Sequence, residues 1–284
     1  MNAPFERIGP AQPKWPVILS VPHAGRAYPP DLSDDCRFPA SRLLPLEDRH
    51  ADLLAEEAWR HGFSGLVAQT PRAIIDLNRA EQDMDPGMLS APLPAPAILS
   101  LKARGGLGLV PRRTALLGDL WRRRFHPDEI EARIEQHHRP YHSALTTLLE
   151  AAHARFGSVL LIDLHSMPPL ARDGIAEPPQ IVIGDRFGRS ATSLLSEIAG
   201  GVAEAAGLRV AFNAPYAGGH ILDRHAAPAR GIHALQIEID RRLYLDRSLS
   251  FPSTGVEMIA GLVATIAKAL SEALIGSALP IAAE

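Results

Sequence analysis

The segment Ser158–Ser166, SVLLIDLHS, ends an unbroken run of aliphatic residues with an aspartate and a histidine. A run of this kind is typical of a strand that is buried on both faces, as in the parallel sheets of α/β proteins. Similar short apolar runs alternate with long amphipathic segments, which is the pattern of strands joined by covering helices. These runs cover residues 15–23, 180–185, 208–213 and 232–240. The pattern predicts an α/β fold in which a mixed β-sheet lies between helical layers.

Three longer segments between these runs have the composition of helices. Residues 46–62 predict a helix that Gly62 ends, and residues 188–207 predict another. Residues 127–157 predict a helical stretch that begins at a proline and breaks at Pro140. These segments supply the helical layers of the expected fold.

Two further segments are less regular. Residues 65–79 predict one or two strands, and residues 83–118 form a long excursion rich in proline and glycine. Loops of that length are uncommon in compact domains unless they serve a function, so we expect the excursion to form a rim or lid over a site. We expect a single domain over residues 1–284, with a core from about 15 to 275.

The overall composition excludes several classes of function. Of the 284 residues, 46% are hydrophobic and 21% are charged, and the net charge is -3, so nucleic acid is not an expected partner. The single cysteine, Cys36, excludes an intrachain disulfide and a cysteine-rich zinc site. The N-terminal stretch MNAPFERIGPAQPKWP carries charges and prolines, unlike a signal or transit peptide. We therefore expect a cytoplasmic protein.

The apolar C-terminal segment at residues 256–283 raises the question of a membrane span. Glu257, Lys268 and Glu272 interrupt it. Apolar residues recur in it at helical spacing, at Ile259, Leu262, Ile266, Leu270 and Leu274. The spacing predicts a helix that packs on the core, and no membrane partner.

Four polar groups follow or end the predicted strands. They are His23, the Asp76–Arg79 stretch DLNR, the Asp163–Ser166 stretch DLHS, and Glu238. In open α/β sheets, ligands bind in the crevice outside the carboxyl ends of the strands. A single histidine after a strand is more often structural, but the joint occurrence of these groups favours a functional site.

Two histidines and one carboxylate, with an open fourth position, are a common ligand set for catalytic zinc. His23 and His165 are the histidine candidates, and Asp163 could orient the His165 imidazole, although the alternation of side chains along a strand does not guarantee that contact. Asp48 is our choice for the carboxylate, because it would begin the helix that follows the first strand. Glu47 and Asp52 stay as alternatives. The competing interpretation of Asp48 is a helix N-cap with a solvated charge.

Glu238 lies on the face of its strand opposite to the apolar residues. Next to a metal, it would take a proton from water and return it to a leaving amine. The competing interpretation is an ion pair with Arg241 or Arg224.

Asn78 and Arg79 fit the recognition of a carboxylate, with Arg72 as a second clamp, unless these arginines are solvent-facing loop residues. His220, which follows a glycine pair, predicts either a loop that closes over substrate or a simple turn.

Several of these motifs together resemble the N-formylglutamate amidohydrolase family, in the same order from about residue 18 to about residue 246. They include SVPHAG, DRHADLLAEEA, PRAIIDLNRAEQDMD, LIDLHSMPP, IVIGDRFG, YAGGHI and ALQIEIDRRLYLD. That family is similar in turn to zinc carboxypeptidases and aspartoacylases, which implies a mixed sheet flanked by helices.

The resemblance also implies roles for individual residues. It implies zinc on His23 and His165, carboxylate binding by Asn78 and Arg79, and general base catalysis by Glu238. The chain departs from the carboxypeptidase pattern at Arg26, which stands three residues after the first histidine, where that pattern has the acidic ligand. Either the acidic ligand lies elsewhere, with Asp48 as the candidate, or the site is built differently.

The resemblance implies a hydrolase that uses one zinc ion, Zn2+, to cleave the N-acyl amide of a small acidic N-acyl amino acid, with N-formyl-L-glutamate as the expected substrate. A deacylase of another N-acyl amino acid or a carboxypeptidase-like peptidase is the close alternative. A non-catalytic binding protein that retains the pocket is the alternative from another class. Zinc is favoured over iron or manganese by ligand type alone, and the sequence leaves the oligomeric state open.

Overall fold

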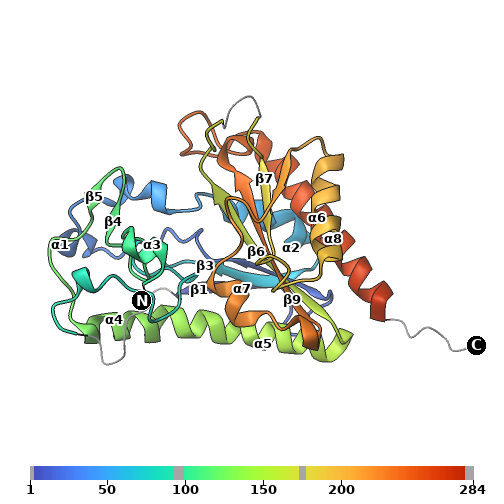
Figure 1. Ribbon diagram of the computed structural model, residues 1–284, viewed down its shortest axis with the longest axis horizontal. Coiled ribbons are helices and arrows are strands. Elements are labelled where there is room, and N and C mark those ends of the chain that lie inside the picture. The colour runs from blue at the N-terminus through green and yellow to red at the C-terminus, as the bar shows by residue number, and fades with distance from the viewer. Residues whose placement is uncertain (1–2, 93–98, 173–176, 279–284) are drawn as a thin grey trace, which may run out of the picture. The chain divides into compact units, whose positions relative to one another are not determined.

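The computed structural model describes residues 3–92, 99–172 and 177–278 (Figure 1). The chain folds into two compact units, each assembled from separate segments. The first comprises Met1–Glu6, Pro22–Arg49 and Ala68–Ser143, and the second comprises Arg7–Val21, His50–Val67 and Ala144–Glu284. The expectation of a single domain stays a prediction.

The second unit contains nearly all of a seven-stranded sheet with the order β1-β3-β2-β6-β9-β7-β8. The four adjacent strands β3, β2, β6 and β9 are parallel to one another. The next strand in the sheet, β7, runs antiparallel to β9, so the expected mixed sheet is confirmed. Every residue of β2, β6 and β7 is buried, which explains their continuous apolar sequences. The strands are β1 (Phe5–Ile8), β2 (Val17–Val21), β3 (Ser64–Ala68), β6 (Val159–Met167), β7 (Ile181–Gly184), β8 (Val210–Phe212) and β9 (Ile232–Asp240).

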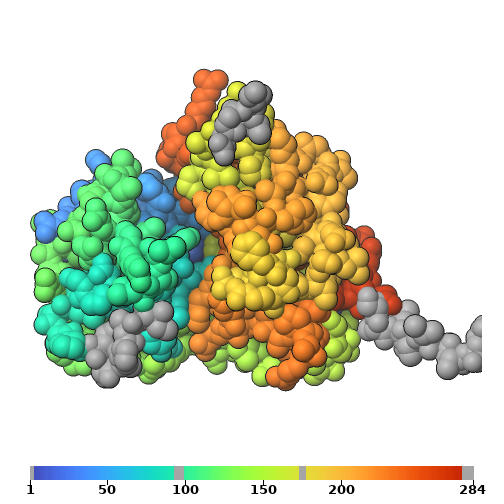
Figure 2. Space-filling view, viewed as in Figure 1, coloured from blue at the N-terminus to red at the C-terminus, as the bar shows by residue number. Residues whose placement is uncertain are grey.

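Helices flank this sheet, and α2, α6 and α8 pack together in one layer (Figure 1). Side chains of the segments around α6 and α7, gold and orange in Figure 2, cover the face of the second unit that is visible there. The helical elements of this unit are η3 (Ala51–Ala55), α2 (Glu56–Arg60), α6 (Ser193–Ala205), α7 (His220–His225), η6 (Pro228–Arg230), η7 (Arg241–Leu243) and α8 (Gly255–Ala278). Helix α5 (Arg139–Phe156) leads into β6.

Helix α8 is the packed C-terminal helix that the apolar spacing predicts. All five residues of the predicted apolar stripe are buried, and the helix contacts α6, α2, β2 and β6. By length and composition, its Gly255–Gly276 portion is the one helix among the described residues that could cross a membrane. Its packing against the sheet is that of a core helix.

The first unit consists mainly of short elements and turns. They are α1 (Leu32–Asp35), η1 (Ala40–Arg42), η2 (Leu44–Leu46), η4 (Pro86–Met88), α3 (Leu101–Arg104), β4 (Arg113–Thr114), β5 (Gly118–Asp119), α4 (Pro127–Arg133) and the π-helical turn η5 (Ile134–His138). The Arg133 guanidinium lies 4.4 Å from the ring centre of Phe125 and 5.3 Å from that of Trp121. Burial lowers the pKa of Arg133 to about 10. Cation–π contacts thus help to hold a unit that has little regular structure.

Two predicted helices are shorter than expected. In the 46–62 segment, η2 ends at Leu46, and helical structure resumes only with η3 and α2. The break occurs because Glu47 has an extended backbone and His50 a left-handed one, with φ of 58°. Gly62 follows the end of α2, with φ of 81°. In the 188–207 segment, α6 begins only at Ser193, because the preceding residue, Thr192, has an extended backbone with ψ of 148°.

The 65–79 segment contains one strand, β3, which is one of the two outcomes predicted for it. The strand ends at Ala68 and turns follow it, so the DLNR stretch does not end a strand, contrary to the prediction. One further prediction is also corrected. The helix from Pro127 to Phe156 does not break at Pro140. A π-helical turn ends two residues before this proline, and the shifted pairing of carbonyl groups in such a turn is a way to accommodate the missing N–H of a proline.

Candidate functional site

In the first unit, His23 and Asp48 lie together. His23 follows the end of β2 by two residues and is buried. The Asp48 backbone N–H donates to the carbonyl of His23 at 2.9 Å, and Asp48 Oδ2 lies 3.5 Å from His23 Nδ1. Asp48 does not begin a helix, contrary to the prediction that selected it, but its carboxylate is nevertheless beside the imidazole.

The neighbouring Glu47 has other partners in the same unit. Its carboxylate accepts hydrogen bonds from the Tyr28 hydroxyl and the Arg49 guanidinium, both at 2.8 Å. Burial and the negative charge of Glu47 raise the pKa of Tyr28, which keeps the phenol protonated as a donor. Within the first unit, Asp48 is therefore the better placed of these two carboxylates to act with His23.

Asp76 is a functional candidate to which the sequence motifs alone assign no role. His23 donates from Nε2 to Asp76 Oδ1 at 2.7 Å, and Arg72 donates from Nε to Asp76 Oδ2 at 2.8 Å. Arg79 Nε lies 3.6 Å from the same Oδ2. The only signal in the sequence is the position of this acid, two residues before the Asn78–Arg79 pair.

The charge of Asp76 follows from these neighbours. Burial of Asp76 favours the protonated acid, but the positive charge of Arg72 and the contact with His23 outweigh it and hold the pKa of Asp76 well below its usual range. An ionised carboxylate only accepts hydrogen bonds, so Nε2 of His23 carries a proton, and Nδ1 is the ring nitrogen that faces Asp48.

The three residues of the predicted carboxylate clamp lie on different secondary structure from that expected, and their role as a clamp stays a prediction. Arg72, Asn78 and Arg79 lie in the turns after Pro71 and not on a strand. The Asn78 backbone N–H donates to Asp76 Oδ1 at 2.8 Å, which tightens the turn. The Asp76 carboxylate thus places Arg72 and Arg79 on one side of the turn.

In the second unit, His165 and Asp163 are in direct contact on β6. His165 donates from Nε2 to Asp163 Oδ2 at 2.9 Å, and the Ser20 hydroxyl donates to Asp163 Oδ1 at 3.1 Å. All three residues are buried. The contact that strand alternation left open is therefore made through Nε2, so Nδ1 is the ring nitrogen of His165 that does not contact Asp163.

Glu238 is on β9, directly opposite His165 in the register of the two parallel strands. Gln236, which lies two residues earlier on the same face, donates from Nε2 to Glu238 Oε1 at 2.9 Å. Arg241 donates to the hydroxyl of Ser166 at 3.2 Å. The strand register thus places a carboxylate beside the histidine that it was predicted to work with.

His220 is the first residue of α7 and is half-buried. It follows Gly218, whose φ of 107° is in the region that favours glycine. This turn is what the glycine pair predicted, whereas its closure over a substrate stays a prediction.

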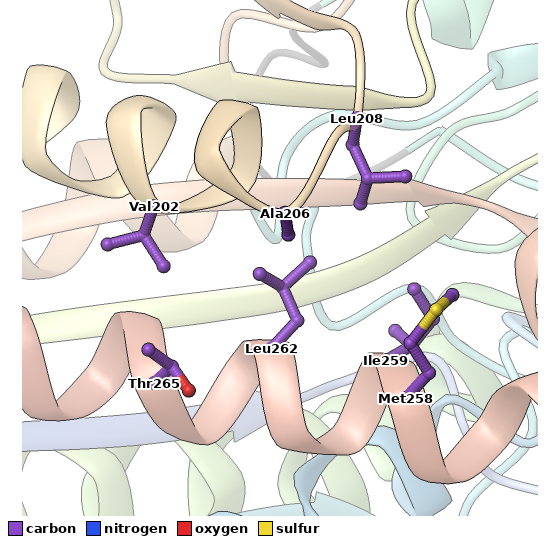
Figure 3. A pocket seen from close by; sticks show the side chains of 7 residues that line it. All are labelled: Val202, Ala206, Leu208, Met258, Ile259, Leu262 and Thr265. Carbon is purple, nitrogen blue, oxygen red and sulfur yellow. The ribbon is translucent and has the colours of Figure 1, made fainter.

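A cavity of about 240 Å³ lies between α6 and α8, away from these strand ends (Figure 3). The residues that line it are apolar except for Thr265, and none is titratable. They are Val202, Ala206, Leu208, Met258, Ile259, Leu262 and Thr265. The cavity offers no group for acid–base or metal chemistry.

The sequence model of the N-formylglutamate amidohydrolase family matches residues 15–245. The chain belongs to this family. The resemblance of the sequence motifs is therefore confirmed, and the protein is an enzyme, an amidohydrolase.

Relatives of this amidohydrolase agree with the assignment. It is 32% identical over 270 residues to N-formylglutamate deformylase of Pseudomonas putida, which covers 93% of this chain and 94% of the relative. It is 28% identical to N-formylglutamate deformylase of Pseudomonas aeruginosa over 83% of this chain and 84% of the relative.

Solved structures support the same fold. The crystal structure of N-formylglutamate amidohydrolase from Ralstonia eutropha JMP134 superposes with a TM-score of 0.90 at 32% identity, covering 97% of this chain and all of the other. A gene product of Agrobacterium tumefaciens shares the fold, with a TM-score of 0.66 at 21% identity over 96% of each chain.

Proposed function

We propose that this amidohydrolase is a zinc-dependent deformylase that hydrolyses N-formyl-L-glutamate to formate and L-glutamate. One observation carries the proposal: the Asp76 carboxylate contacts both the imidazole of His23 and the guanidinium of Arg72. The same carboxylate therefore orients an imidazole suited to bind a metal and a guanidinium suited to bind an anion. The activity in the names of the two Pseudomonas relatives supports the same substrate.

The proposed zinc ligands are His23, Asp48 and His165. The two imidazoles each donate one ring N–H to a buried carboxylate, Asp76 and Asp163 respectively. This arrangement is typical of histidines that bind metal. The hydrogen bond fixes the tautomer of the ring and makes its other nitrogen a more basic ligand for the metal. When bound, zinc supplies a Lewis acid that polarises the formyl carbonyl and lowers the pKa of a water molecule.

The chain's own residues supply the remaining chemistry. Glu238 takes the proton of the attacking water and delivers it to the glutamate nitrogen as the C–N bond breaks. Gln236 holds the carboxylate of Glu238 through its 2.9 Å hydrogen bond. Asn78 and Arg79 bind a carboxylate of the substrate, with Arg72 as a second arginine of the clamp. This binding holds the scissile amide of the substrate in place. His220 is a further candidate for substrate contact at the start of α7.

The test combines a metal assay with a substrate panel. Protein purified without added metal is assayed for bound zinc, and release of free amino acid is measured for N-formyl, N-acetyl and N-succinyl derivatives of glutamate, aspartate and leucine. We expect about one zinc per chain, loss of turnover on chelation with recovery on adding zinc, and the highest kcat/KM for N-formyl-L-glutamate.

Other outcomes would redirect the proposal. Faster cleavage of another acyl group or amino acid would make the enzyme a different deacylase of the same class. Cleavage of C-terminal residues from peptides in preference to every acyl amino acid would make it a peptidase. Full activity after exhaustive removal of metal would exclude the zinc mechanism.

A further inference from the structure

Two buried histidines of the first unit lie one helical turn apart, where the π-helical turn η5 meets α5. His138 and His142 are fully buried, and their ring centres are 4.3 Å apart. Nε2 of His138 lies 2.8 Å from the carbonyl oxygen of Arg79, and Nε2 of His142 lies 3.0 Å from that of Leu77. A carbonyl oxygen only accepts hydrogen bonds, so both imidazoles carry a proton on Nε2.

The two carbonyls flank Asn78, in the turn that carries the proposed clamp. This segment is outside any strand, and so no sheet ladder holds its backbone. Its other anchors include the Asp76 N–H on the carbonyl of Leu109 at 2.6 Å and the Asn78 N–H on Asp76 Oδ1 at 2.8 Å. The two histidines add hydrogen bonds to the carbonyl groups of this turn, at Leu77 and Arg79.

We infer that His138 and His142 are positioning residues for substrate binding. By holding the carbonyls of Leu77 and Arg79, they keep the intervening peptide in the conformation that presents the Asn78 and Arg79 side chains to a carboxylate. The π-helical turn beside His138 fits this role, because such turns occur frequently at functional sites. The inference rests on the proposed function of Asn78 and Arg79.

A purely structural role is the competing explanation, since a buried histidine with a satisfied hydrogen bond can simply fill the core. The two roles differ in a measurable way. A core residue, when replaced, lowers stability but leaves KM of the folded molecules unchanged. A positioning residue changes KM for substrates that need the clamp, while kcat and metal content stay close to those of the parent.

The test compares His142→Leu with His142→Gln. The glutamine amide nitrogen is the same number of bonds from the backbone as Nε2 of histidine, so it can still donate to the carbonyl of Leu77, whereas leucine cannot. We expect His142→Leu to raise KM for N-formyl-L-glutamate about 10- to 100-fold, as displacement of a binding group does. His142→Gln should recover most of that loss, with bound zinc near the parental level in both variants.

His153 provides a matched control in the same helix. Its Nε2 also donates to a backbone carbonyl, that of Arg230 at 2.8 Å, but it is outside the first unit and far along the chain from the clamp. His153→Leu should therefore leave KM unchanged. A KM change in this control equal to that of His142→Leu would overturn the inference, because it would reflect general loosening of the protein.

A second pair keeps the inference testable if His142→Leu does not fold. His138→Asn stays polar but is too short to reach the carbonyl of Arg79, whereas His138→Gln reaches it. We expect His138→Asn to raise KM for N-formyl-L-glutamate and His138→Gln to leave it near the parental value. The inference is contradicted if His142→Leu and His138→Asn both keep the parental KM. It is also contradicted if the glutamine variant recovers KM at neither position.

The outcomes also separate this inference from the proposed function. If the parent enzyme releases no amino acid from any N-acyl substrate, the proposed function fails. If the parent deformylates N-formyl-L-glutamate and the variants bind it as tightly, only the positioning role fails.

Discussion

The two oxygens of the Asp76 carboxylate have different partners. Oδ1 accepts from Nε2 of His23 at 2.7 Å, and Oδ2 accepts from Nε of Arg72 at 2.8 Å. Because the group is buried, its charge depends on these cationic and donor neighbours. One side chain therefore orients a proposed metal ligand and part of a proposed anion clamp, and its replacement should disturb both.

We expect Asp76→Asn to lower zinc affinity about 10- to 100-fold, as loss of a carboxylate behind a metal-binding histidine does. The amide should also weaken inhibition by the product L-glutamate, because Arg72 and Arg79 lose their shared carboxylate. Zinc retention during dialysis against a chelator and the inhibition constant measure the two effects. Asp163→Asn is the control: it should lower zinc affinity without changing L-glutamate inhibition. Equal effects of the two variants on both quantities would refute the dual role of Asp76.

Glu238 has a role that can be separated from metal binding. Glu238→Gln keeps the size of the side chain but removes the base, so turnover should fall by at least about 100-fold. Zinc content and L-glutamate affinity should stay near the parental values, since Glu238 is proposed as neither ligand nor clamp. Loss of zinc together with activity would instead make Glu238 the acidic ligand, in place of Asp48.

At the level of elements, one acid makes several of the hydrogen bonds in the connection from β7 to α6. Asp185 accepts from the Gly188 N–H at 2.9 Å, the Ser196 hydroxyl at 2.7 Å and the Asn213 amide at 2.8 Å. Burial favours the protonated acid, but these hydrogen bonds outweigh it and lower the pKa of Asp185. The ionised carboxylate thus ties the start of α6 to the turn after β8.

The pKa shift of Asp185 has a defined consequence for stability. A carboxyl group whose pKa is lower in the folded than in the unfolded state stabilises the protein above about pH 4, and loses that effect as pH falls through the folded value. We therefore expect Asp185→Asn to lower Tm at pH 7, with the difference from the parent shrinking toward pH 3. Asp31→Asn, at an exposed residue whose side chain makes no cap hydrogen bond, should shift Tm little at any pH. A Tm difference for Asp185→Asn that is independent of pH would contradict this account.

At the level of the whole molecule, α8 connects the helical layer to the sheet. Leu270 is fully buried in this helix, whereas Ile275 is 40% exposed. Leu270→Ala should lower the free energy of unfolding by about 2–5 kcal/mol through lost burial and the cavity left behind. Ile275→Ala should cost about 0.5 kcal/mol or less, because an exposed substitution disturbs little packing. Equal losses in urea unfolding would mean that the Leu270 side of α8 is not the core side.

The same variant tests the single-domain prediction. Trp121 is in the first unit, and the other tryptophans, Trp15 and Trp59, are in the second. In a Trp15→Phe, Trp59→Phe background, fluorescence reports on the first unit, while far-UV circular dichroism follows the whole chain. We expect Leu270→Ala to shift both unfolding curves equally. A fluorescence curve that does not move would show two independently unfolding domains.

Much of the sheet and part of the site could be predicted from the sequence. Buried strands need apolar residues, so β2, β6 and β7 can be recognised from their continuous apolar runs, and polar residues next to the ends of β2 and β6 are conspicuous because a core excludes them. Gly62 and Gly157 end their helices with positive φ, as expected of a residue without a Cβ atom. These features are local, and local sequence determines them.

Only the tertiary structure decided which side chains work together. His23 and Asp76 are separated by 53 residues, and His142 and Leu77 by 65, yet each pair shares a hydrogen bond. No periodicity reports such pairing, because it depends on how turns outside the sheet pack. For the same reason the sequence predicts a strand around Asp76, where the structure has turns, and a helix start at Asp48, which lies in a turn beside His23. The chain by itself determined the strands and the kinds of groups at their ends, whereas long-range packing decided the partners of each group.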